Sequence, residues 1–261
     1  MRDRRNLIVA VLLVLFVILS FVIYIFNNNK GTVYIGDVTK LEIKKGKIAI
    51  NKKQKKLNLT QAKIYFNGSF INGYLKSDKG DINNKAILYE AYNEDGVILR
   101  FTDDLLAYTG NVNIKVADIN MLDIMADDDS TIVFDFFKSI GGGDNHSVDI
   151  LDYKKIVYDL DNDGKLEYIY SVDILEEGTT DTSFVFICDG NEKKLINKKT
   201  GEIDNVDLKK VSFFNLIDLN EDNKYEIVIR VKNGEYGSNS YKIYNYDGNL
   251  KEIKWKENFY V

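Results

Sequence analysis

The chain has 261 residues, 45% of them hydrophobic, and a formal net charge of −5 at pH 7. This composition excludes a disordered tail, and the length allows one or two domains with a buried core. The single cysteine excludes an intramolecular disulfide, and the lysines are interleaved with acids, so we expect no nucleic-acid partner. The 17 tyrosines and 14 phenylalanines favour β-structure.

Residues 7–26 form an uncharged apolar segment. As a helix rising about 1.5 Å per residue, it would span roughly 30 Å, the thickness of a bilayer core. Arginines at positions 2, 4 and 5 precede it, so residues 1–6 are predicted as a cytoplasmic tail and the remainder as extracytoplasmic. The segment exceeds the apolar region of a signal peptide and lacks a small-residue cleavage site. We therefore predict an uncleaved signal-anchor of a single-pass cell-membrane protein; the alternative is a cleaved signal peptide.

Residues 27–147 are predicted as a β-rich region of short strands and turns. Asp127, Asp128 and Asp129 are interpreted as a solvated loop, because consecutive side chains of an extended segment point to opposite sides. The predicted strands are Val33–Ile35, Lys40–Ile43, Lys47–Ile50, Ala62–Phe66, Ala86–Tyr92 and Val97–Phe101.

Residues 148–261 contain an internal repeat. Each unit is predicted to hold two strands around an acidic loop, then two strands around an Asp-Gly-Asn turn. The acidic loops recur after 59 residues and the turns after 58. Because the loops and the turns recur at nearly the same spacing, they identify an internal repeat. Four strands are the content of one propeller blade. The predicted strands are Tyr153–Tyr158, Leu166–Val172, Ser183–Cys188 and Lys193–Ile196, then Val211–Ile217, Tyr225–Val231, Tyr241–Tyr246 and Leu250–Trp255.

The acidic loops are candidate calcium sites, because Ca²⁺ takes several oxygen ligands from carboxylates and carbonyls. Gly164 permits the positive φ of a tight loop, and Asn223 replaces it in the second copy. The predicted ligands of the first loop are Asp159, Asp161, Asp163, the carbonyl of Lys165, and Glu167. Those of the second are Asp218, Asn220, Asp222, the carbonyl of Lys224, and Glu226.

An EF-hand is excluded, because position twelve of the two loops is Tyr170 and Ile229 and the flanks alternate with the period of strands. The pattern Asp-x-Asp-x-Asp-Gly-x-x-Glu between strands resembles the calcium loops of FG-GAP and VCBS repeats. The resemblance covers residues 150–255 and implies integrin-α-like propeller blades, with the ligand roles just given. The second loop lacks the glycine, and no Phe-Gly…Gly-Ala-Pro segment is present. Two blades cannot close a propeller, so any further blades would come from degenerate segments within residues 31–147.

Other chemistry-bearing residues receive structural interpretations. His146 is assigned to a solvated loop and Cys188 to the core, and no catalytic residue is predicted. An aromatic cluster near the C-terminus is interpreted as core, with a sugar-stacking face as the alternative. It comprises Tyr236, Tyr241, Tyr244, Tyr246, Trp255, Phe259 and Tyr260.

The sequence thus predicts an all-β extracytoplasmic domain behind a membrane anchor, containing at least two propeller-blade-like repeats stabilised by Ca²⁺. The expected function is a binding or adhesion-like module with a protein or glycan ligand outside the cell. The alternatives are an envelope-associated hydrolase, with glycan as its candidate substrate, and an accessory ectodomain of a membrane complex.

Overall fold

The computed structural model describes residues 30–35, 39–44, 47–51, 59–79, 87–93, 98–99, 105–143, 148–178, 180–202, 208–234 and 239–253. The predicted signal-anchor at residues 7–26 and the histidine at position 146 lie outside these ranges. Within the described ranges, no helix combines the length and the apolar character needed to cross a membrane.

The first eight strands form one antiparallel sheet, the N-terminal sheet, in the order β3-β2-β1-β8-β4-β5-β6-β7. The strands predicted between residues 33 and 101 are confirmed where the structure describes them, whereas β5 and β8 were not expected. Asn67 and Gly68 turn β4 into β5 with φ of 48° and 82°, as a tight hairpin requires. The strands are β1 (Lys30–Ile35), β2 (Thr39–Lys44), β3 (Lys47–Asn51), β4 (Thr60–Phe66), β5 (Ser69–Lys79), β6 (Ile87–Asn93), β7 (Ile98–Leu99) and β8 (Leu106–Gly110).

Each repeat forms four consecutive antiparallel strands, which match the predicted ones in order. The first-repeat sheet contains β11 (Val148–Tyr158), β12 (Glu167–Glu176), β13 (Thr180–Asp189) and β14 (Glu192–Glu202). The second-repeat sheet contains β15 (Lys209–Asp218), β16 (Glu226–Asn233), β17 (Ser240–Tyr246) and β18 (Leu250–Glu252).

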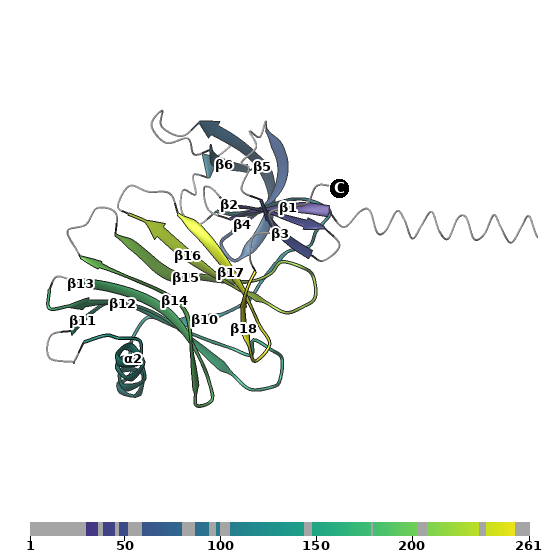
Figure 1. The fold of residues 1–261 in the computed structure, drawn as a ribbon. Coiled ribbons are helices and arrows are strands. Elements are labelled where there is room, and N and C mark those ends of the chain that lie inside the picture. Colours follow the sequence, from purple (N-terminus) through teal and green to yellow (C-terminus); the bar gives the residue numbers. More distant parts are fainter. Residues whose placement is uncertain are drawn as a thin grey trace, which may run out of the picture.

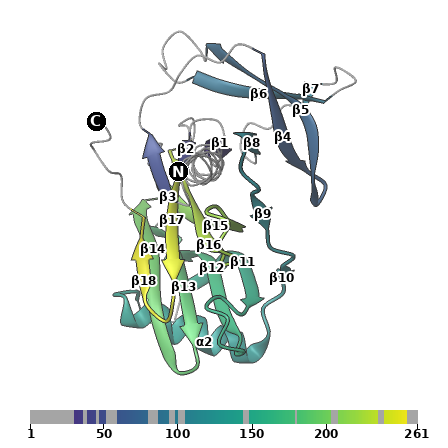
Figure 2. The ribbon, with the colours of Figure 1, turned by 90° about the vertical axis from the view of Figure 1, so that its right-hand side faces the viewer.

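A segment outside the repeats adds a fifth strand to both of these sheets. Strand β9 (Lys115–Val116) pairs with the end of β15, and β10 (Asn120–Leu122) pairs with β11. One stretch of eight residues therefore runs along the edges of both repeat sheets (Figure 2). Strands this short carry no period-two signal, and the sequence did not predict them.

The three sheets and a helix form successive layers (Figure 1). Because successive strand residues point to opposite faces, Val185 and Ile187 of β13 pack into the core between the two repeat sheets. Phe184 and Phe186 of the same strand pack into a core beneath helix α2 (Asp127–Ser139). The outer face of the second-repeat sheet packs against the N-terminal sheet, where Val228 and Ile243 meet Val33 and Ile35.

Helix α2 corrects the prediction of an all-β fold with a solvated loop at Asp127–Asp129. Over the described residues the fold is mostly β with one helix, which begins at these acids. Their charge favours the positive N-terminal end of the helix dipole. The side chain of Asp129 is buried, and its Oδ1 accepts hydrogen bonds from Lys155 Nζ at 2.6 Å and the Tyr170 hydroxyl at 2.8 Å. Burial opposes ionisation of Asp129, but these donors outweigh it and lower its pKa.

An ionic cluster spans the two repeat sheets. Lys210 of β15 forms ion pairs with Asp173 of β12, at 2.7 Å, and with Asp181 of β13. The two carboxyl groups thus contact the same ammonium, and the Oδ1 atom of each is buried without a hydrogen-bond partner among the described residues. Burial and the neighbouring Asp181 carboxyl raise the pKa of Asp173 to about 6, against the opposing effect of Lys210.

Candidate metal centre

The first acidic loop connects β11 to β12 and is shaped by its own hydrogen bonds. Asn162 and Gly164 adopt positive φ, 61° and 87°, so the chain curls back on itself. The Asp159 carboxylate accepts hydrogen bonds from the amides of Asp163, at 3.1 Å, and Gly164, at 3.0 Å. Glu167 reaches back from β12 to accept the Leu160 amide at 2.7 Å. The acids therefore hold the loop closed around themselves.

The loop gathers three carboxylates. Oxygen atoms of Asp159, Asp161 and Glu167 all lie within 4.8 Å of one another. Calcium–oxygen distances are about 2.3–2.6 Å, so oxygen atoms up to roughly 5 Å apart can share one ion. This donor set, all oxygen and three times negative, fits a hard divalent cation.

The negative charges of the neighbouring acids oppose the ionisation of Glu167. Burial raises the pKa of Glu167, which is 2% exposed, and the charges of Asp161, Asp189 and Asp159 raise it further, while the Leu160 amide opposes the shift. A cation among these oxygens would relieve this repulsion and favour the ionised form of Glu167.

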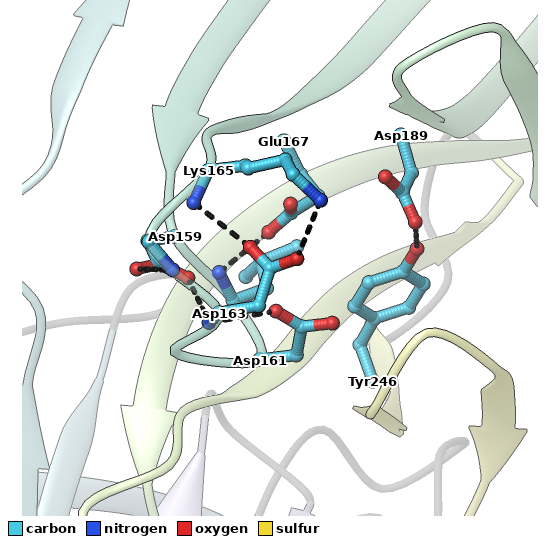
Figure 3. A network of polar contacts seen from close by, with 9 residues as sticks. Asp159, Asp161, Asp163, Lys165, Glu167, Asp189 and Tyr246 are labelled. Carbon is cyan, nitrogen blue, oxygen red and sulfur yellow. Dashed lines mark hydrogen bonds and ion pairs between the residues drawn. The ribbon is translucent and has the colours of Figure 1, made fainter.

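One of the five predicted ligands in this loop, Asp163, is paired with a cation of the loop itself. The Asp163 carboxylate accepts the Lys165 amide at 2.8 Å and contacts the Lys165 ammonium at 3.1 Å, so it lies outside the group of three (Figure 3). The role of the Lys165 carbonyl stays a prediction.

The second loop, between β15 and β16, repeats the conformation of the first at a spacing of 59 residues. Glu221 and Asn223 adopt φ of 64° and 62°, at the positions of Asn162 and Gly164. Asparagine therefore takes the left-handed conformation in place of glycine, as predicted. Four hydrogen bonds of the first loop recur in the second. Glu226 accepts from the Leu219 amide at 2.9 Å, and Asp218 accepts from the Asn223 amide at 3.1 Å. Asn220 accepts from the Asp222 amide at 3.1 Å, and Asp222 accepts from the Lys224 amide at 2.8 Å.

The second loop differs in its donor atoms. Asn220 stands where the first loop has Asp161, and its Nδ2 donates to Asp222 at 3.0 Å. Asp218 is fully buried, and its Oδ1 has no hydrogen-bond partner among the described residues. Burial raises the pKa of Asp218 and raises that of Glu226 to about 8. A buried, unpartnered carboxylate oxygen is costly, and a bound cation would supply the missing partner.

Comparisons with family models, curated proteins and solved structures give no match. The family resemblance therefore stays a prediction that depends on the loops themselves. Both loops connect strands, whereas an EF-hand loop lies between two helices.

The first loop lies against the second repeat, which sequence analysis did not anticipate. The Tyr246 hydroxyl, at the end of β17, donates to Asp189 Oδ2 at 2.6 Å, beside the group of three carboxylates (Figure 3). The next hairpin approaches as well, because a Cβ on Gly248 would lie 3.9 Å from Asp161 Oδ2. The sequence signal for this contact was the aspartate that precedes the glycine in the second turn of each repeat. Spacing along the chain could not show that Asp189 would meet Tyr246.

The remaining candidates have structural roles where the structure describes them. Cys188 is buried in the core beneath α2, and burial raises the pKa of its thiol to about 11. Tyr241, Tyr244 and Tyr246 are buried, which agrees with the core interpretation of the aromatic cluster. Residues 236, 255, 259 and 260 of that cluster lie outside the described ranges.

Proposed function

We propose that this protein is a membrane-anchored, calcium-stabilised binding module whose extracytoplasmic domain contains two FG-GAP/VCBS-like repeats. The observation that carries the metal part is the convergence of Asp159, Asp161 and Glu167 within 4.8 Å. In this proposal Ca²⁺ stabilises the repeats, and ligand binding takes place elsewhere on the domain.

The position of the loop supports a structural role for the ion. Glu167 is almost fully buried, and the loop joins two strands whose inner faces form the core between the repeats. An ion there would neutralise acids that now repel one another at the boundary between the repeat sheets. Because it would bind the native fold and not the unfolded chain, it would raise the free energy of unfolding by mass action.

The extracytoplasmic setting of the proposal rests on the apolar segment at residues 7–26 and the arginines before it. Calcium is plentiful outside cells, where modules with affinities on the order of 10⁻⁴–10⁻³ M are still filled. A loop with three converging carboxylates therefore needs no high affinity to be occupied.

The test is a calcium titration of the full chain in detergent, followed by calorimetry and by thermal unfolding with and without chelator. We expect the unfolding midpoint to rise with calcium, and D161N to weaken calcium binding at the first loop by about tenfold or more, since it removes one of three converging charges. The matched control is D152N, the same chemical change at an exposed position of β11. Equal midpoints with calcium and with chelator would refute the metal site.

A further inference from the structure

A cleft of about 430 Å³ opens where the three sheets meet. Its walls come from the β4–β5 hairpin of the N-terminal sheet, from β15 and β16 of the second-repeat sheet, and from β10 and β11 of the first-repeat sheet. The volume lies within the roughly 300–1,000 Å³ of small-molecule sites. None of the predicted metal ligands lines it.

Aromatic side chains with fixed positions form part of the wall. The register of β15 against β16 shifts between Phe213 and Asn215, so Phe214 lies at a β-bulge, a feature that redirects side chains. Its ring packs edge-on against Tyr241 at 5.0 Å. On the opposite wall, Tyr65 is held by Phe70 at 5.2 Å between ring centroids. Rigid rings of this kind offer flat apolar surfaces at little entropic cost.

The charge of the cleft is opposite to that of the molecule. Its described lining includes two cations, Lys154 and Arg230, and no carboxylate, although the chain carries a net charge of −5. The Arg230 guanidinium lies 5.3 Å from the centre of the Phe214 ring, which orients its planar donors. A concave site lined by one sign of charge concentrates ligands of the other sign.

The remaining polar lining consists of hydroxyl and amide groups, among them Ser212, Asn67 and Asn215. These groups both donate and accept, as neighbouring sugar hydroxyls do. A peptide bound as an added strand would instead need a free strand edge. Here the amides of Val211 and Phe213 on β15 already donate to buried serine hydroxyls of the first-repeat sheet, at 2.8 and 3.0 Å.

We propose that this cleft binds an acidic saccharide, whose ring stacks on the aromatic wall and whose carboxylate pairs with Lys154 and Arg230. The inference rests on the proposed role as a binding module and adds the class of its ligand. It does not require that either acidic loop hold a metal.

The test measures binding of a di-uronic acid to the full chain in detergent, by calorimetry and by saturation-transfer NMR. The probes for comparison are the neutral disaccharide with the same rings and inorganic phosphate. We expect the di-uronic acid to bind in a salt-dependent manner and both comparison probes to bind at least about tenfold more weakly, because each lacks either the charge or the ring. Equal binding of the neutral sugar or of phosphate would overturn the assignment.

Variants locate the site. K154Q is expected to weaken di-uronate binding by about tenfold, the effect of losing one charge-assisted hydrogen bond. R230K keeps the charge but loses the planar fork, and is expected to cost about fivefold. The matched control is K63Q, the same change as K154Q on an exposed residue of β4 outside the cleft. S212D adds a carboxylate to the cleft and should abolish binding.

The unfolding midpoint of each variant, measured in the same samples, shows whether it is folded. Unchanged affinity in folded K154Q and S212D, or weaker binding in K63Q, would refute the site. Unfolding with calcium and with chelator separates the two proposals: equal midpoints together with intact di-uronate binding refute only the metal site. A calcium effect without di-uronate binding refutes only the cleft.

Discussion

Replacing Asp181 with asparagine should change how stability depends on pH. Asp173 and Asp181 both contact Lys210 between the repeat sheets, and a hydrogen bond between two such neighbouring carboxyl groups would need one proton. Both Oδ1 atoms are buried and have no hydrogen-bond partner among the described residues, so we expect the two carboxyl groups to share one proton. The amide of an asparagine at position 181 carries its own hydrogen atoms, so it can donate to Asp173 without taking up a proton.

The size of the effect follows from the pKa of Asp173, about 6 in the fold against 3.8 for an unperturbed aspartate. Because the folded pKa is raised, the native state holds the proton more tightly than the unfolded chain. The resulting stability is therefore complete below pH 3.8 and is lost as the pH rises through 6. At 1.36 kcal/mol per pKa unit the loss is on the order of 2–3 kcal/mol, equivalent to a fall in midpoint of roughly 4–12 °C. D181N should remove this fall, because Asp173 then ionises beside Lys210 with a donated hydrogen bond.

The assay is thermal unfolding of the full chain in detergent between pH 3.5 and 7.5, for wild type, D181N and the exposed control D152N. The midpoint of D181N minus that of wild type should increase with pH across this window, whereas the corresponding difference for D152N should stay flat. Subtracting the wild-type midpoint at each pH removes the contributions that other acids with raised pKa, such as Glu167, make to the pH dependence of stability. Parallel pH profiles for D181N and wild type would show that the two carboxyl groups do not share a proton.

Two further predictions concern single hydrogen-bonded acids. D129N should destabilise the fold by about 3 kcal/mol, because it leaves the largely buried Lys155 ammonium without its counter-charge. Denaturant unfolding measures this loss, and the control D128N, at an exposed neighbouring residue, should change the free energy of unfolding by less than about 1 kcal/mol. Y246F should cost about 2 kcal/mol by removing the bond to Asp189, and a double-mutant cycle with D189N tests it: fully additive losses would contradict a direct interaction.

Local patterns predicted much of the β-structure. The alternation of Tyr225, Ile227 and Ile229 identified the strand β16, although its other face, which carries Val228, is buried as well. Acids at every second position identified the loop before it. Both loops take the predicted left-handed residues, Gly164 and Asn223. These features depend on neighbours within a few residues, which is the range over which periodicity and turn chemistry act.

Helix α2 was missed because its composition favours other structures. The three leading aspartates favour loops, and Thr131, Ile132 and Val133 are β-branched. The available signal was the spacing of Asp129, Val133, Phe136 and Phe137, which share one buried helical face.

Contacts between distant segments were beyond sequence reasoning. Asp173, Asp181 and Lys210 lie on three strands of two sheets, and Asp189 meets Tyr246 across 57 residues. No spacing rule predicts such meetings, because they depend on how the sheets stack. The same limit applies to the cleft, whose walls come from all three sheets.

The strand segment at residues 115–122 has a consequence for the order of folding. Lys115 and Val116 are synthesised about a hundred residues before Asp218 and Ile217, their partners on β15. Contacts between such distant residues carry a large loop-closure entropy and form late. During synthesis, the N-terminal sheet and the first repeat can fold while β9 still lacks its partner. A chain shortened before β15 would therefore leave β9 without its partner strand.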